Sequence, residues 1–213
     1  MSIHEPATLL TDYLLAILAA GFAWRLSRHP AIKIPAGRWW FRSLIVLSLS
    51  AFVGGSYHGF APNFPPIVDE LWWRSVLWII CLLGFTMGSA LVCEFSGSND
   101  RAFWPRLLMA KFVVASMVIM VLPIFLVAII DYGLAMLAWL LAALLVRRPW
   151  RGWIIVAVLL SGAAAWVQQS GFQGAGLLNH NDIFHLIQAL ALGAFYRAAI
   201  GTGVASGSVD SPP

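Results

Sequence analysis

Residues Trp72–Cys93 read WWRSVLWIICLLGFTMGSALVC, a run in which Arg74 is the only charged residue. As an α-helix this run is long enough to cross the hydrocarbon core of a bilayer, which takes about 20 apolar residues. The whole chain of 213 residues follows the same trend, with 61% hydrophobic and only 10% charged residues. Soluble domains carry about 25% charged residues. The sequence therefore predicts an integral membrane protein.

Seven apolar segments of this kind predict an all-α, seven-transmembrane helix bundle as one domain over residues 1–200. The tail over residues 201–213 is rich in Gly, Ser and Pro and is expected to be disordered. The predicted spans are Leu9–Leu26, Phe41–Phe60, Trp72–Cys93, Leu107–Leu122, Leu126–Val146, Trp153–Gln168 and Asp182–Ala198. A tight turn near Leu122–Phe125 is expected to separate the fourth span from the fifth. The first run begins after the acidic residues Glu5 and Asp12, so we expect a retained span and no cleavable signal.

The basic residues predict an orientation with the N-terminus outside and the C-terminus in the cytoplasm. In that orientation Arg74 is the only one of the 13 lysine and arginine residues on the outer side. The inner ones are Arg25, Arg28, Lys33, Arg38, Arg42, Arg101, Arg106, Lys111, Arg147, Arg148, Arg151 and Arg197. Since basic residues in a membrane protein report orientation, the net charge of +4 does not indicate a nucleic-acid partner.

Small and aromatic residues fit the same layout. Tryptophans near span ends predict an aromatic belt; they are Trp39, Trp40, Trp72, Trp73, Trp104, Trp150 and Trp153. The pairs Gly55-x3-Gly59 and Gly84-x3-Gly88 have the spacing that lets two helix backbones approach closely. Cys81 and Cys93 fall in one apolar segment and are expected to be buried thiols, not a disulfide.

Polar residues suited to chemistry cluster at the outer ends of three predicted spans. His58 lies about one turn from the outer end of the second span, and Asp69 comes immediately before the third. The seventh span starts with His180–Asp182, and His185 lies about one turn further in. Histidine and carboxylate at membrane depth are costly and usually functional. We therefore expect these groups to converge in the outer half of the membrane.

Zinc suits such a cluster, because catalytic zinc takes three protein ligands, often histidines, and a water molecule. His58 and His185 are the expected ligands. His180, Asp69 or Asp182 would fill the third position, His180 only if the first turn of the helix is unwound. The carboxylate of Asp69 would take the proton from the bound water.

Structural roles compete with these assignments. Asn181 or Asp182 could be the N-cap of the seventh span, and Asn181 is a poor zinc ligand although it shares a helix face with His185. Asp69 could be a first-turn acid favoured by the helix dipole. Asp131 is expected to be a helix-start or interhelical polar group.

Three motifs in order along the chain resemble those of the CREST superfamily. They are Gly54-Gly-Ser-Tyr-His58, Asp69 eleven residues further on, and Asn181-Asp-Ile-Phe-His185. The superfamily includes alkaline ceramidases, adiponectin receptors and GPI-anchor remodelling proteins. Its signature is Ser-x3-His on the second span, Asp near the start of the third and His-x3-His on the seventh. Gly54 stands at the position of the serine and Asn181 at that of the first histidine, with His180 displaced by one residue and Ser56 nearby.

In that superfamily the histidines bind zinc, and the characterised members hydrolyse lipid amides or esters. The resemblance therefore implies a zinc-dependent intramembrane hydrolase of the alkaline ceramidase type, acting on a membrane lipid. Zinc would be held by His58, His185 and His180, with Asp69 as the catalytic acid–base. Asn181, Ser56 and Asp182 would contact the metal ligands without binding the metal themselves.

Other functions remain open. Gly54 and Asn181 favour a non-catalytic receptor or structural membrane subunit on the same fold, because both replacements remove a reactive group. A haem or quinone protein would use His58 and His185 facing each other across the bundle. A transporter is disfavoured, because no charge is expected at mid-membrane. Small size, short loops and the absence of an Asn-x-Ser/Thr acceptor predict a bacterial inner membrane, with an endoplasmic reticulum or Golgi membrane as the alternative.

Overall fold

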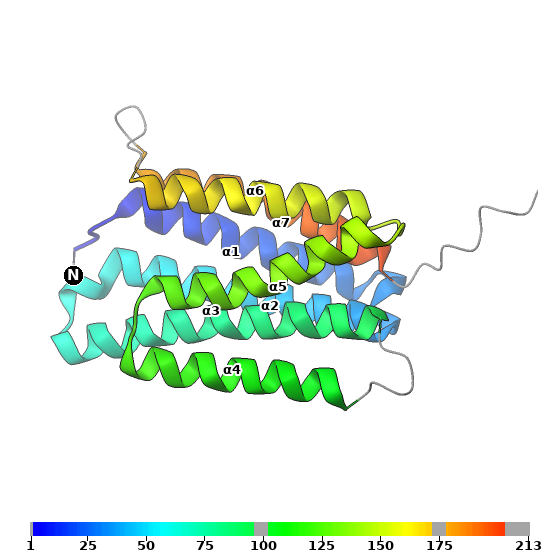
Figure 1. Cartoon of the computed structure of the whole chain (residues 1–213). Coiled ribbons are helices and arrows are strands. Elements are labelled where there is room, and N and C mark those ends of the chain that lie inside the picture. Colours follow the sequence, from blue (N-terminus) through cyan, green and yellow to red (C-terminus); the bar gives the residue numbers. More distant parts are fainter. Residues whose placement is uncertain (1, 96–101, 172–177, 203–213) are drawn as a thin grey trace, which may run out of the picture.

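The computed structural model describes residues 2–95, 102–171 and 178–202. These residues form seven helices long and apolar enough to cross a membrane, which confirms the predicted number of spans (Figure 1). The helices are α1 (Pro6–Ser27), α2 (Pro35–Phe60), α3 (Pro66–Phe95), α4 (Phe103–Val121), α5 (Phe125–Leu145), α6 (Arg151–Ser170) and α7 (His180–Gly201). Short 3₁₀ turns, η1 (Pro30–Lys33) and η2 (Ala61–Asn63), follow α1 and α2. The predicted turn near Leu122–Phe125 separates α4 from α5. The predicted tail lies outside the described residues from position 203 onward.

Prolines and a capping box set several helix starts. Pro6, Pro35 and Pro66 begin α1, α2 and α3, where the N–H that proline lacks would have no partner within the helix. Before α7, the Asn179 side chain accepts a hydrogen bond from the backbone N–H of Asp182, and the Asp182 carboxylate accepts one from the backbone N–H of Asn179. This reciprocal cap holds the first turn of α7 in place.

The helices α1, α2, α3, α5, α6 and α7 pack in that order as a ring, and α7 packs back against α1. α4 lies outside the ring against α3 and α5. Figure 1 shows the start of α1, the α2–α3 connection, the α4–α5 turn and the start of α7 at one end of the bundle. We call it the site end, because the candidate residues of α2 and α7 lie there.

Buried tryptophans pack the other half of the bundle. Trp40, Trp139 and Trp150 are each at most 1% exposed. The Trp139 indole N–H donates to the backbone oxygen of Met87 at 3.0 Å, so the buried polar atom is satisfied. The predicted aromatic belt is wrong for Trp40 and Trp150, because both indoles turn into the protein core and not toward the lipid.

Close helix packing at the predicted glycines is confirmed. A Cβ atom on Gly55 would lie 2.7 Å from Cβ of Asp12, and one on Gly84 would lie 2.6 Å from Oδ2 of Asp131. Glycine therefore lets α2 approach α1, and α3 approach α5, to distances that any side chain would prevent. The two cysteines are free thiols, as predicted; Cys81 is buried, whereas Cys93 is only partly buried, so the prediction of two buried thiols is wrong for Cys93.

A buried ion pair joins α4 to α5. Lys111 Nζ lies 2.6 Å from Asp131 Oδ1, and the exposed fractions of the two side chains are 22% and 3%. The lysine also donates to the Asp131 backbone oxygen at 3.1 Å. Lys111 therefore lies within α4 and not in an inner loop, and the expectation of no charge at mid-membrane is wrong. Arg101, another predicted inner residue, lies outside the described residues.

Candidate functional site

A cavity of about 390 Å³ lies within the ring of helices, and its lining residues come from α1, α2, α3, α5, α6 and α7. Most of its wall is apolar. Polar side chains from α1, α2, α6 and α7 also line it, including Asp12, His58, Gln168, Asn181 and His185. An apolar cavity with a few convergent polar groups is the usual form of a small-molecule or lipid site.

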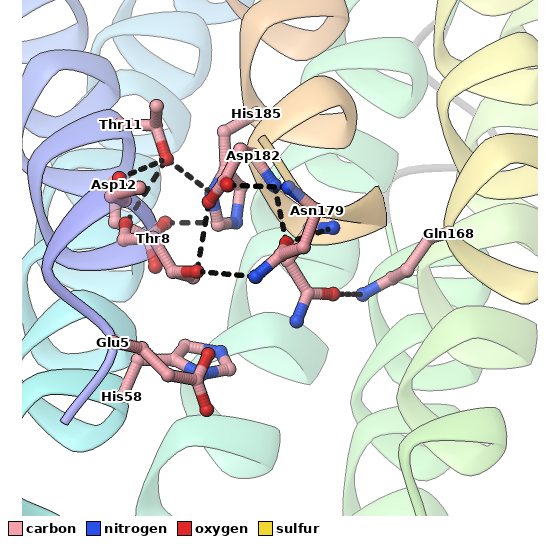
Figure 2. A network of polar contacts seen from close by, with 11 residues as sticks. Glu5, Thr8, Thr11, Asp12, His58, Gln168, Asn179, Asp182 and His185 are labelled. Atoms are coloured by element: carbon pink, nitrogen blue, oxygen red, sulfur yellow. Dashed lines mark hydrogen bonds and ion pairs between the residues drawn. The ribbon is translucent and has the colours of Figure 1, made fainter. Parts of the chain in front are cut away.

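One polar contact beside the cavity joins α1 to α7. His185 Nε2 lies 3.2 Å from Asp12 Oδ1, and His185 Nδ1 lies 3.1 Å from Thr11 Oγ1 (Figure 2). Asp12 is 5% exposed and His185 is 6% exposed, so little water reaches either group from outside the bundle. The two ring nitrogens of His185 are thus held by two consecutive residues of α1.

Two arrangements of protons fit the contacts of His185 with Thr11 and Asp12. The Thr11 hydroxyl donates to backbone oxygens of its own helix, those of Ala7 and Thr8, at 3.1 Å. Its oxygen is then free to accept a hydrogen bond from the Nδ1–H of His185. In the neutral imidazole this leaves Nε2 without a proton, facing a carboxylate oxygen. In this tautomer a proton or a metal cation lies between His185 and Asp12. In the other tautomer the Nε2–H of His185 donates to the Asp12 carboxylate, and Nδ1 accepts a hydrogen bond from the Thr11 hydroxyl.

His58 also contacts a carboxylate, but a different one. Its Nδ1 lies 3.1 Å from Oε2 of Glu5, the residue immediately before α1. Within the described ranges no hydrogen bond joins Nε2 of His58 to another residue. Figure 2 shows the Glu5–His58 pair apart from the Asp12–His185 pair. The cavity is therefore bordered by two histidine–carboxylate pairs.

Asp182 ties the start of α7 to α1. Its Oδ1 accepts a hydrogen bond of 2.8 Å from the hydroxyl of Thr8, and its Oδ2 accepts one of 2.7 Å from the backbone N–H of Asn179. The N-cap of α7 is Asn179, so neither Asn181 nor Asp182 has that position. Asp182 completes the capping box and fixes the part of α7 that carries His185.

Asn181 and Gln168 form an amide pair on the cavity wall. The Gln168 Nε2 atom donates to Asn181 Oδ1 at 3.4 Å, and both side chains line the cavity. The Oε1 atom of Gln168 is buried and has no hydrogen-bond partner among the described residues. The pair therefore presents an unused acceptor from α6.

Four predicted site residues do not line this cavity: Asp182, described above, and Asp69, Ser56 and His180. Asp69 lies beside the Tyr57 side chain. Ser56 lies between α1 and α2, where its hydroxyl contacts the Tyr13 hydroxyl at 2.9 Å. His180 begins α7, and its Nδ1 is buried without a hydrogen-bond partner in the described structure. Of the predicted site residues, the cavity brings together His58, Asn181 and His185.

Sequence reasoning missed Asp12, Glu5, Thr11 and Gln168. Glu5 and Asp12 were expected to precede the first apolar run, whereas Asp12 lies in the second turn of α1 and faces His185. The signal that identifies it is a carboxylate within a span, which needs a polar partner. Thr11 and Gln168 carry no comparable signal, since neutral polar residues are common near span ends.

The types of donor atom at the site suit zinc, but the side chains that carry them are not close enough together to hold it. The described residues contain no group of three or more His, Cys, Asp or Glu side chains placed to hold a metal ion. Two imidazoles and a carboxylate, as in His58, His185 and Asp12, are a set that catalytic zinc uses. The Nδ1 atoms of these histidines contact Glu5 and Thr11, the kind of contact that orients metal-binding imidazoles.

Neither curated proteins nor solved structures gave a match to this chain. Nothing in these comparisons links it to the CREST superfamily, so that resemblance stays a prediction. One family model does match, and it covers residues 7–203, which include every helix from α1 to α7. On that match, the chain belongs to the family of unknown function DUF6962.

Proposed function

We propose that this protein is an intramembrane hydrolase that cleaves amide or ester bonds of membrane lipids. The observation that supports it most is the Asp12–His185 pair, buried at the polar end of an apolar cavity. A carboxylate and an imidazole that share a proton are the groups that activate water in many hydrolases. The apolar wall supplies a place for the hydrocarbon chain of the substrate.

The depth of the pair suits a lipid substrate. Asp12 follows Pro6, the first residue of α1, by a helical rise of about 9 Å. Hydrolysable linkages of membrane lipids lie between the headgroup and the hydrocarbon core, so a site one to two turns below the helix ends meets them. A substrate chain that occupies the cavity would direct its carbonyl group toward Asp12, His58 and His185.

Zinc is part of the proposal, with Asp12 in the third position in place of His180. His58 would have to move its free Nε2 toward Asp12 and His185, since these residues do not yet form a group that holds a metal ion. When bound, zinc would polarise the substrate carbonyl and make the attacking water more acidic. Glu5 and Thr11 would keep the imidazoles oriented.

The second carboxylate oxygen of Asp12, Oδ2, is the proposed proton acceptor, while Oδ1 would bind the zinc ion. Oδ1 is held by His185, while Oδ2 lies on the side of Gly54, where a Cβ atom would be 3.7 Å away. Gly54 thus leaves room beside this oxygen for a water molecule. The role in proton transfer that the sequence predicts for Asp69 stays a prediction, to be compared directly with that of Asp12.

A non-catalytic receptor or structural subunit is the second candidate. The observation that favours it is that both ring nitrogens of His185 are already engaged by side chains of α1. Such a protein would bind a lipid in the cavity without turning it over.

We propose that the site end faces outward and that the membrane is a bacterial inner membrane, with an endoplasmic reticulum or Golgi membrane as the alternative. The basic residues support this orientation. Arg25, Arg38, Arg147 and Arg197 lie near the helix ends opposite the site end, and positive residues stay on the cytoplasmic side.

The test combines metal content with turnover in detergent-purified protein. Inductively coupled plasma mass spectrometry measures the amount of zinc per chain. Hydrolysis is followed with a fluorogenic dodecanoyl ester and the matching dodecanoyl amide. We expect about one zinc per chain, turnover in the wild type, and loss of both in His185→Ala and His58→Ala. His29→Ala is the matched control, because His29 caps η1 beyond the end of α1. A folded wild type that binds the probes without cleaving them would favour the non-catalytic candidate.

A further inference from the structure

The amide side chains of Asn181 and Gln168 lie together on the cavity wall, on adjacent helices. Gln168 comes from the last turn of α6 and Asn181 from the first turn of α7. Gln168 Nε2 donates to Asn181 Oδ1, so the Asn181 amide is fixed with its oxygen toward α6. Its Nδ2 group therefore points away from Gln168, and no hydrogen bond joins Nδ2 to another described residue.

The backbone of the first turn of α7 offers few further donors. The Asn179 side chain already accepts hydrogen bonds from the backbone N–H groups of Asn181 and Asp182, at 2.8 and 3.1 Å. The side-chain Nδ2 of Asn181 is then the available donor of this turn beside the cavity. Its position at a helix N-terminus favours an acceptor that carries partial negative charge.

Gln168 provides the complementary group. Its Nε2 is used on Asn181, and its Oε1 is buried without a partner in the described part of the chain. An unpaired buried carbonyl oxygen is unfavourable, and a bound N–H or O–H donor would relieve it. Both side chains line the cavity, and between them they hold one donor and one acceptor that have no partner in the described structure.

We propose that Asn181 and Gln168 form a subsite for secondary amides. Asn181 Nδ2 donates to the carbonyl oxygen of the ligand, and Gln168 Oε1 accepts from its N–H. An ester carries the carbonyl but no N–H, and a tertiary amide also lacks the N–H. This inference rests on the proposed lipid-binding cavity and narrows its substrates from amides or esters to lipids with a secondary amide.

Equilibrium binding in lipid nanodiscs tests the subsite without requiring turnover. The probes are radiolabelled N-methyldodecanamide, N,N-dimethyldodecanamide and methyl dodecanoate, which share one hydrocarbon chain. We expect the wild type to bind the secondary amide about five- to tenfold more tightly than the other two, the effect of one hydrogen bond. Gln168→Leu and Gln168→Met should remove that preference, because neither side chain accepts a hydrogen bond from the amide N–H.

Asn181→Asp keeps the shape of the side chain and suits a first helical turn, but it removes the donor. It should weaken binding of all three probes. Gln169→Leu is the matched control, because Gln169 neighbours Gln168 in α6, is exposed and does not line the cavity. It should bind like the wild type.

Equal affinity of the wild type for the three probes would overturn the subsite, and so would a preference that survives both Gln168 variants. A different result would reject the proposed function. A secondary-amide preference without hydrolysis of any fluorogenic substrate would retain the subsite and reject the hydrolase. Hydrolysis without a preference for the secondary amide would support the hydrolase and reject the subsite.

Discussion

The Nε2 atom of His185 lies 3.2 Å from Oδ1 of Asp12, and this contact joins the first and last helices of the bundle where they border the cavity. The two residues are 173 positions apart in the chain, so only the closed ring of helices brings them together. Because Thr11 holds the other ring nitrogen, the imidazole has one defined orientation toward the carboxylate. The pair is therefore arranged in advance for proton transfer or for a cation.

The first prediction concerns Asp12. Asp12→Asn keeps the size of the side chain but removes the carboxylate, and we expect hydrolysis to fall about 10²–10⁴-fold, as for loss of a general base. The measurement is kcat with the fluorogenic dodecanoyl ester in detergent. Asp69→Asn, assayed in parallel, separates the two carboxylates. If Asp69→Asn abolishes turnover and Asp12→Asn does not, the proton acceptor is the one that the sequence predicts.

The second prediction concerns the contact behind His58. Glu5→Gln loses the charge beside His58 Nδ1, and we expect zinc affinity to fall about 10–100-fold, as when an outer-shell partner is removed. Competition with a fluorescent zinc chelator measures this affinity. Glu70→Gln is the control, since Glu70 pairs with Arg74 one turn away on the same helix. Equal affinities in both variants would show that Glu5 does not orient a ligand.

The sequence predicted the spans well and the site only in part, for a physical reason. A span is a local property of about 20 residues, so hydropathy alone located all seven helices and the turn near Leu122–Phe125. That His58 and His185 lie at the same end of the bundle could be predicted because successive spans run in opposite directions. This prediction requires no knowledge of side-chain geometry. The partner of each histidine could not be predicted in this way. Whether Glu5 and Asp12 contact His58 and His185 depends on how α1 is rotated against α2 and α7.

The buried ion pair shows the same limit. Lys111 lies within the fourth predicted span, and Asp131 within the fifth. Hydropathy averages over such single charges, and the positive-inside pattern led to the assignment of Lys111 to an inner loop. Only the packing of α4 on α5 shows that each neutralises the other.

The third prediction concerns orientation. A C-terminal fusion to green fluorescent protein should fluoresce in a bacterial host, and a C-terminal fusion to alkaline phosphatase should be inactive. Both results follow if the basic end of the bundle lies in the cytoplasm. Active phosphatase together with a dark fluorescent protein would reverse the proposed orientation and place the site end in the cytoplasm.

The fourth prediction compares two neighbouring glycines of α2. In Gly55→Ala the new methyl group would lie 2.7 Å from Asp12 Cβ and 3.1 Å from Tyr13 Cδ1, so α1 and α2 must separate. We expect a loss of about 1–3 kcal/mol in the free energy of unfolding, as for other overpacked interfaces. Gly54→Ala is the matched control, because its nearest neighbour would be 3.7 Å away, an ordinary contact. Thermal unfolding in detergent ranks the two, and equal stability would contradict the close approach of α1 and α2.

The fifth prediction concerns the Lys111–Asp131 pair, which lies within helices and so has little water to solvate either charge. Lys111→Met leaves the Asp131 carboxylate buried without its partner, and we expect a loss of about 3–5 kcal/mol in the free energy of unfolding. Asp131→Leu should lower the free energy of unfolding by a similar amount, because it leaves the Lys111 ammonium group without its partner. The double variant leaves no unpaired charge and should be more stable than either single variant, which requires a coupling energy larger than the loss in one single variant, about 3–5 kcal/mol. Reversible unfolding in mixed micelles measures all four proteins. Additive losses would mean that the two charges do not stabilise each other, and that apolar contacts with α3 and α5 hold α4 to the bundle.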